Sequence, residues 1–501
     1  MESNVVVLLG FWREEALFMK SNGKSQLRTA ISVALVLITA LSALSKDAET
    51  EDIEGVWMGT VQISAFEWRI VFKISTNPDG TLTATMDYPY QRAENIAVNK
   101  VTFENGRLYL ESKVIQGAYE GQVKEDGSIE GKWQQGGLSF PLLLERTYVT
   151  PKLHRPQEPE KPYPYIEEEV SYENEEAGIR LAGTLTLPRS EGPFPAVILI
   201  TGSGRQDRNE TMFGHRPFLV LADYLTRKGI AVLRVDDRGV GGSTGNLLES
   251  TVEDFAGDVL TGVNYLMSRK EINPSKIGLV GHSEGADIAP IAAVRSSDVA
   301  FIVLMAGTGL TLEEFTYLQN HLVLKSVGVS DRVLAMHRRC SEQMFEILKN
   351  EKDNAVAEKK LRDIMTHFLA NLSTKEKDAM GASEAAIEIQ LKTLFSRWFR
   401  FFLTYDQKPT LTKVKCPVLA INGQLDLQVP SKENLSAIEE ALKTGGNTNY
   451  TIQELPEHNH LFQRAQTGAI SEYAKIEETI SPIALRVIAQ WILTQTSRAN
   501  R

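Results

Sequence analysis

The chain has 501 residues, of which 42% are hydrophobic and 24% are charged, and its formal net charge is −10. Its length predicts more than one domain, and its composition is that of a globular protein with enough apolar residues for a core. An acidic chain without a cluster of Lys and Arg argues against a nucleic-acid partner. The two cysteines, Cys340 and Cys416, are too few for a disulfide framework and form no C-x-x-C metal motif. The sequence leaves open whether they pair.

Residues 1–45 are typical of a signal peptide preceded by an N-terminal extension. Three basic residues come before the uncharged apolar run 30–44, which ends in small residues. The run is short for a transmembrane helix, so we expect no stable membrane span in the mature chain. Met19 is an alternative start, and retention of the segment as a membrane anchor is an alternative fate. The sequence therefore predicts a periplasmic or extracellular protein.

Residues 50–148 carry the pattern of short strands separated by turns. The run 66–72, for example, is followed by the turn sequence Asn-Pro-Asp-Gly at 77–80. Helical periodicity is absent, which predicts a small all-β domain. The next segment, 149–165, contains five prolines and reads as a linker.

Residues 166–501 show apolar runs that alternate with helical stretches. This alternation predicts an α/β domain with a mostly parallel sheet covered on both faces. The expected strands are 196–201, 230–235, 277–280, 300–305, 417–421 and 450–455. Between about 310 and 405 the alternation stops and the pattern is helical, so we expect a helical lid over a pocket.

Residues 281–285, with the sequence Gly-His-Ser-Glu-Gly, match the pattern G-x-S-x-G between a strand and a helix. A serine on such a tight turn adopts a strained backbone, and the flanking glycines avoid clashes. Its hydroxyl then projects above the sheet near a helix N-terminus, where the helix dipole favours developing negative charge. The pattern predicts that Ser283 is a catalytic nucleophile, with His282 packed inside the turn.

A serine hydroxyl needs a base, usually histidine, that is held by a carboxylate, and both partners are expected after later strands. Asp426 lies in a turn directly after the strand 417–421 and is the candidate acid. Two histidines, His458 and His460, follow the strand 450–455. Their positions alone do not say which of them is the base.

These segments resemble those of exported bacterial α/β-hydrolases related to small-ester hydrolases and dipeptidyl-peptidase-like families. The resemblance covers the chain from about residue 165 to its end, and the preceding β-domain is similar to the one that such proteins carry. The segments that carry it are 199–204, 206–210, 236–239, 281–285, 423–430 and 459–463. One departure is Thr201-Gly202, where many relatives have His-Gly.

The resemblance implies an α/β-hydrolase fold with a helical lid and an N-terminal all-β domain. In that group the motif Asn-His-Leu-Phe holds the base, which implies His460 and leaves His458 as a neighbour. Backbone N–H groups of Glu284 and Ser203 are expected to stabilise an oxyanion. The pair Asp236-Asp237 beside an arginine is interpreted as part of an internal salt bridge, and neither a metal nor a cofactor is expected.

The resemblance favours a serine hydrolase that cleaves small-molecule carboxylic esters with small acyl groups through an acyl-enzyme. One alternative is a serine peptidase or aminopeptidase on short peptides, for which Glu210 or Asp207 are candidates to bind a free amine. Another alternative is a non-catalytic binding protein on a hydrolase scaffold. The oligomeric state is not visible in the sequence.

Overall fold

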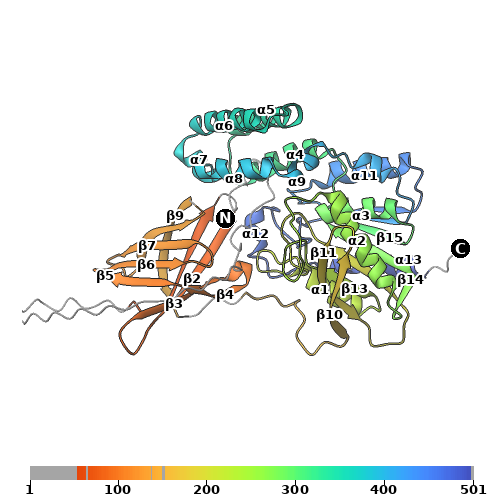
Figure 1. The fold of residues 1–501 in the computed structure, drawn as a ribbon, viewed down its shortest axis with the longest axis horizontal. Coiled ribbons are helices and arrows are strands. Elements are labelled where there is room, and N and C mark those ends of the chain that lie inside the picture. Colours follow the sequence, from red (N-terminus) through yellow and green to blue (C-terminus); the bar gives the residue numbers. More distant parts are fainter. Residues whose placement is uncertain (1–52, 64–65, 137, 149–152, 498–501) are drawn as a thin grey trace, which may run out of the picture.

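The computed structural model of the chain describes residues 53–63, 66–136, 138–148 and 153–497 (Figure 1). The export signal expected at residues 1–45 lies outside this part. Within these ranges, no helix combines the length and the hydropathy that crossing a membrane would require. An all-β part precedes an α/β part, as the sequence predicts, and the two lie beside each other.

The all-β part forms one nine-stranded sheet in the order β4-β3-β2-β1-β9-β8-β7-β6-β5. Alternation of apolar and polar residues buries one face, on which the ring of Phe72 packs against those of Tyr119 and Trp133, each with 6.0 Å between centroids. The strands are β1 (Gly55–Ile63), β2 (Phe66–Thr76), β3 (Leu82–Tyr88), β4 (Ala93–Val98), β5 (Lys100–Glu104), β6 (Arg107–Ser112), β7 (Gly117–Val123), β8 (Ile129–Gln135) and β9 (Leu138–Thr147). A short 3₁₀ turn, η2 (Pro89–Gln91), joins β3 to β4.

The α/β part has an eight-stranded sheet in the order β10-β11-β13-β12-β14-β15-β16-β17. The six strands from β12 onward are parallel, and all six were predicted, five of them from continuous apolar runs. The first two strands are antiparallel additions that the sequence analysis did not identify. The strands are β10 (Ile166–Asn174), β11 (Ile179–Leu187), β12 (Phe194–Ile200), β13 (Ala231–Val235), β14 (Ile272–His282), β15 (Phe301–Met305), β16 (Val418–Gly423) and β17 (Tyr450–Leu455).

Helices cover both faces of this sheet, and neighbouring residues of one strand face opposite cores. Ile198 of β12 packs with α2 (Val252–Met267), α3 (Glu284–Arg295) and α11 (Ser431–Thr444). Its neighbours Val197 and Leu199 pack on the other face. That face is covered by α1 (Pro217–Thr226) and α13 (Pro482–Ser497). This double coverage explains why the parallel strands are continuously apolar.

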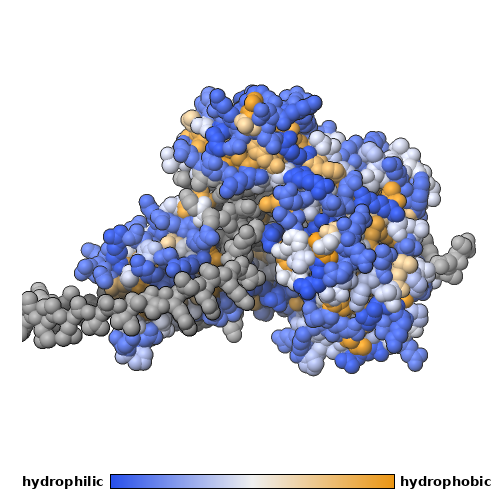
Figure 2. Space-filling model, viewed as in Figure 1, coloured by the Kyte–Doolittle hydropathy of each residue, from blue (hydrophilic) through white to orange (hydrophobic). Residues whose placement is uncertain are grey.

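A helical insertion lies between β15 and β16 and has an apolar core of its own. It occupies the segment in which a lid was expected, and its action as a lid stays a prediction. Its helices are α4 (Leu312–Ser326), α5 (Asp331–Asn350), α6 (Asn354–Ala370), α7 (Thr374–Met380), α8 (Glu384–Leu394), α9 (Arg397–Thr404) and α10 (Lys408–Leu411). Cys340 of this insertion and Cys416 before β16 are free thiols. Figure 2 shows a mostly hydrophilic surface in this view, with a small apolar patch on the insertion.

The all-β part packs against the segment that follows β17. Leu461 and Tyr473, with the short helix α12 (Ile470–Tyr473), belong to the same apolar cluster as the β-sheet core. The buried Arg155 of the connecting segment donates hydrogen bonds to the backbone carbonyls of Phe213 and Ala474, at 3.1 and 2.9 Å. The all-β part is therefore anchored next to the loop that carries His460.

Candidate active site

Ser283 lies on a sharp turn between β14 and α3, with φ 54° and ψ −120°. A non-glycine residue with positive φ is uncommon and is a form of backbone strain found at functional sites. A Cβ on Gly281 would lie 2.0 Å from the carbonyl oxygen of Gly285, and one on Gly285 would lie 2.2 Å from that of Ile200. Both positions therefore require glycine, and the turn presents Ser283 at the N-terminus of α3.

Asp426 and His460 meet at the carboxyl edge of the sheet, from loops after β16 and β17. The Asp426 Oδ2 atom lies 2.8 Å from Nδ1 of His460, and both residues are buried. The other carboxylate oxygen accepts the backbone N–H groups of Gln428 and Val429, each at 2.8 Å. Since the carboxylate is fixed by the backbone, it orients the imidazole with Nδ1–H toward Asp426 and Nε2 as the proton acceptor.

The Ser283 hydroxyl is buried and makes no hydrogen bond to any residue that the structure describes. The residue before Ser283, His282, links this turn to the base loop, because its ring lies 4.8 Å from the ring of His460 and its Nε2 atom lies 3.0 Å from the His460 carbonyl oxygen. Contacts between a nucleophile and its base are often long in the absence of substrate. The structure thus contains the predicted acid–base pair and the elbow, without a hydrogen bond between Ser283 and His460.

The competing histidine is directed elsewhere. His458 places Nδ1 2.6 Å from the carbonyl oxygen of Pro456 and Nε2 2.6 Å from Oγ of Ser481. Both of its ring nitrogens are occupied, so His458 does not contact Asp426. The geometry separates the two histidines, which position in the sequence could not do.

The serine aminopeptidase S33 family matches residues 216–463, a segment that contains Ser283, Asp426 and His460. Esterase EstD of Thermotoga maritima is 25% identical over 394 residues, which cover 76% of this chain and 81% of that protein. The chain is an α/β-hydrolase.

Two similar solved structures are those of a protein named as an esterase, Pf2001, and of Est1E. The Pyrococcus furiosus esterase Pf2001 has a TM-score of 0.38 at 17% identity, over 66% of this chain and 91% of its own. Est1E from Butyrivibrio proteoclasticus has a TM-score of 0.38 at 15% identity, over 66% of this chain and 99% of its own.

The turn after β12 lies directly beside Ser283, the predicted nucleophile. A Cβ on Gly202 would be 3.3 Å from Cβ of Ser283, and the Gly202 N–H already donates to Oε1 of Glu210 at 2.7 Å. The next residue is Ser203, one of the two predicted oxyanion donors. The other, Glu284, is the first residue of α3, where backbone N–H groups have no partner within the helix. Glu284 therefore directly follows Ser283 and Ser203 follows the residue that lies beside it, and the roles of both candidates stay predictions.

The side chain of Glu284 is buried behind the elbow. Its Oε1 atom accepts the indole N–H of Trp398 from the helical insertion at 2.8 Å, and burial raises the pKa of Glu284 to about 7. Glu284 lines a cavity of about 70 Å³ together with Asp237, whose pKa burial raises well above its ordinary value. Asp237 accepts hydrogen bonds from the Thr201 hydroxyl at 2.6 Å and the Gln206 N–H at 2.8 Å. The rear of the site is therefore rich in buried carboxyl groups.

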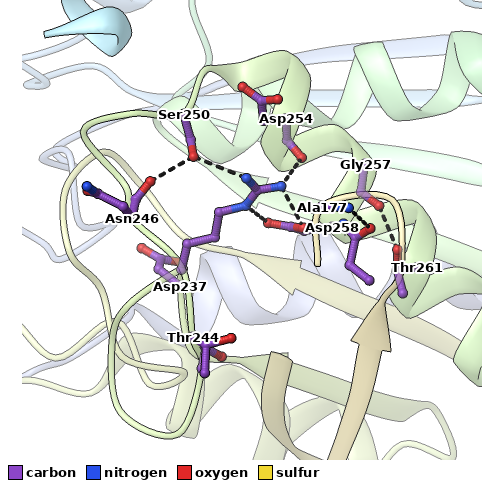
Figure 3. Close-up of polar contacts among 12 residues, drawn as sticks. Ala177, Asp237, Thr244, Asn246, Ser250, Asp254, Gly257, Asp258 and Thr261 are labelled. Carbon is purple, nitrogen blue, oxygen red and sulfur yellow. Dashed lines mark hydrogen bonds and ion pairs between the residues drawn. The ribbon is translucent and has the colours of Figure 1, made fainter. Parts of the chain in front are cut away.

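The charged side chains of Asp236 and Arg238 form salt bridges, and their partners lie outside the segment 236–239. Asp236 pairs with Arg208 at 2.8 Å. Arg238 donates to Ser250 and to the Asp254 carbonyl, each at 3.1 Å, and pairs with Asp258 of α2 (Figure 3). No group of His, Cys, Asp and Glu suited to a metal ion occurs among the described residues.

Sequence reasoning missed two contacts at the site, that of Glu284 with Trp398 described above and one between His282 and Glu210. His282, expected only to pack within the elbow, has Nδ1 2.9 Å from Oε1 of the fully buried Glu210. The only signal in the sequence was the presence of an ionisable residue in each of two motifs, Glu210 in 206–210 and His282 in 281–285. Their 72-residue separation gave no reason to join them.

Proposed function

We propose that the protein is a serine hydrolase that cleaves carboxylic esters with small acyl groups through an acyl-enzyme intermediate. The observation that carries the proposal is the 2.8 Å contact between Asp426 and His460 beside a serine on a strained glycine-flanked elbow. The relationship to a protein named as an esterase, at 25% identity, supports ester substrates. The restriction to small acyl groups rests on the resemblance stated from the sequence.

In the proposed mechanism, Nε2 of His460 takes the proton of Ser283 as the hydroxyl oxygen attacks the ester carbonyl carbon. Asp426 keeps the imidazole in the required tautomer and stabilises the imidazolium. The N–H groups of Glu284 and Ser203 stabilise the oxyanion, and loss of one such donor typically raises the barrier by ~3 kcal/mol. The imidazolium then protonates the leaving alcohol, and a water activated by His460 hydrolyses the acyl-enzyme.

A serine aminopeptidase is the second candidate, because the matching family carries that description. The two carboxylates considered for binding a substrate amine have other partners. Glu210 is fully buried and bonds to Gly202 and His282. Asp207 accepts the N–H groups of Asn209 and Thr211, at 2.9 and 3.0 Å. Since both stabilise their own loop, they favour the ester hydrolase over the aminopeptidase.

A fluorophosphonate probe tests the proposed nucleophile. We expect the wild-type protein to be labelled and Ser283→Ala not to be labelled. Ser341→Ala is the matched control, because Ser341 is also a buried serine whose hydroxyl has no hydrogen-bond partner among the described residues. Loss of labelling in the control, or labelling that survives Ser283→Ala, contradicts the assignment. An unlabelled wild-type protein favours the non-catalytic alternative.

A substrate panel then tests the reaction. We expect p-nitrophenyl acetate and butyrate to be hydrolysed faster than long-chain p-nitrophenyl esters and faster than aminoacyl p-nitroanilides. Faster cleavage of the anilides supports the aminopeptidase. Export stays a separate proposal that rests on the sequence of residues 1–45, and fractionation of the expressing cell tests it.

A further inference from the structure

His282 makes two polar contacts across the site, one from each ring nitrogen. Nδ1 lies 2.9 Å from Oε1 of Glu210, and Nε2 lies 3.0 Å from the backbone carbonyl oxygen of His460. A carbonyl oxygen only accepts hydrogen bonds, and a carboxylate does the same, so both ring nitrogens carry a proton. Burial lowers the pKa of His282, but Glu210 and the His460 carbonyl oppose it, and the net pKa is raised.

Glu210 makes two contacts with one oxygen. Its Oε1 atom accepts the N–H of Gly202 at 2.7 Å as well as that of His282. Its Oε2 atom is buried and has no hydrogen-bond partner among the described residues. A buried carboxylate is costly unless it is paired, so the charge on His282 is the compensation that this site offers. Glu210 itself has a positive φ of 52°, which shows that its loop is held in a strained form.

Two other buried histidines, His215 and His458, contact hydroxyl and carbonyl groups instead of a carboxylate. His215 contacts Oγ1 of Thr479 at 2.9 Å and the Tyr473 carbonyl oxygen at 3.0 Å, and burial lowers its pKa to about 3. His458 contacts a carbonyl oxygen and a hydroxyl. Neither of these contacts is with a carboxylate. The pairing of His282 with a carboxylate therefore is not a general consequence of burying a histidine in this fold.

We propose that Glu210 and His282 are positioning residues that fix the oxyanion turn and the His460 loop relative to each other. A single chain of contacts runs from the Gly202 N–H to Glu210, then to His282, and then to the carbonyl of His460. Gly202 adjoins the predicted donor Ser203, and His282 precedes Ser283. The pair thus connects the segments that must surround the reacting carbonyl, and this role rests on the hydrolase mechanism proposed above.

The full charge on Glu210 is needed to complete the chain of contacts. A carboxylate oxygen accepts from both Gly202 and His282, and it keeps His282 doubly protonated. In Glu210→Gln the neutral imidazole has one N–H, and the glutamine oxygen still has to accept from Gly202. The imidazole then bonds either to the glutamine or to the His460 carbonyl. One contact is lost although the side chain keeps its size.

The experiment compares kcat per active site and KM in variants whose active sites are titrated by the ester burst. We expect Glu210→Gln to retain a full burst, with kcat per site lowered by about tenfold, as for the loss of one hydrogen bond to a charged group, and KM changed less than twofold. His282→Asn keeps a donor near Glu210 and loses the contact with His460, so it lowers kcat in the same way. If His282→Asn does not fold, Glu210→Gln alone provides the test.

His458→Asn is the matched control, since it also shortens a buried histidine near the His460 loop. We expect it to lower the melting temperature while kcat per titrated site stays within twofold of the wild type. A kcat per site in Glu210→Gln within twofold of the wild type overturns the positioning role, as does an equal loss in His458→Asn. A wild-type protein that shows neither a burst nor fluorophosphonate labelling overturns the proposed function together with this inference.

Discussion

The indole N–H of Trp398 donates a hydrogen bond to Oε1 of Glu284, with 2.8 Å between the two atoms. Trp398 belongs to α9 of the helical insertion, and Glu284 directly follows the proposed nucleophile. The ring of Trp398 also stacks on that of Phe402, with 4.9 Å between centroids. The insertion is therefore joined to the nucleophile elbow by a specific polar contact as well as by apolar packing.

Replacing Trp398 by phenylalanine should destabilise the protein by about 1–3 kcal/mol, because a buried carboxyl oxygen loses its donor while most of the ring packing is kept. Urea unfolding measures the change. Trp491→Phe is the control, since its indole N–H bonds to Thr451 at 3.2 Å at an exposed position and its loss should cost less. Equal losses in the two variants would contradict the importance of the Glu284 contact.

Glu284→Gln should change how stability depends on pH. An ordinary glutamate in the unfolded chain ionises near 4.5, whereas burial raises the pKa of folded Glu284 to about 7. The protonated group therefore contributes its full stability below pH 4.5, and the contribution is lost as the pH rises through 7. Glutamine does not ionise, so the stability of the variant relative to the wild type should rise by on the order of 3 kcal/mol between pH 4.5 and 8. Unfolding free energies at the two pH values measure this, and a difference that does not change with pH would refute it.

The parallel core of the sheet could be predicted because each buried strand is a continuous apolar run between turn signals. The first two strands could not be predicted in this way. Arg180, Thr184 and Thr186 interrupt the apolar residues of β11, and β10 alternates exposed and half-buried residues and carries three consecutive glutamates. Such a strand gains its place by pairing with β11, which is a tertiary event.

The site shows the same division between local and long-range information. The elbow at Ser283 is local, because two glycines and a strand–helix junction determine it. The contacts of Trp398 with Glu284 and of Glu210 with His282 join residues 114 and 72 positions apart. A single sequence contains no periodicity that would reveal such pairs, so they became visible only in the folded chain.

Asp426→Asn should lower kcat on p-nitrophenyl esters by about 10⁴-fold, because the neutral amide no longer stabilises the imidazolium or selects the tautomer. The loop itself should remain, since the amide oxygen still accepts the N–H groups of Gln428 and Val429. Asp87→Asn is the control. Asp87 is also buried and accepts a backbone N–H, from Asn95 at 2.8 Å, but it lies in the all-β part. A small loss in Asp426→Asn would mean that another group holds the base.

Two glycine-to-alanine substitutions should change the stability of the protein in opposite directions. At Gly281 the added methyl carbon would lie 2.0 Å from the Gly285 carbonyl oxygen and 2.6 Å from the Ala286 nitrogen, and these backbone atoms cannot move aside without opening the elbow. We expect Gly281→Ala to lose about 4 kcal/mol or more, or to fail to fold. Gly257 lies in α2, where a Cβ would meet nothing within 4 Å, so Gly257→Ala should gain about 0.5–1 kcal/mol from helix propensity. Melting temperatures of the two variants measure the contrast. If Gly281→Ala were as stable as the wild type, the close approach of β14 to α3 would not be required, and the strained conformation of Ser283 would lose its structural cause.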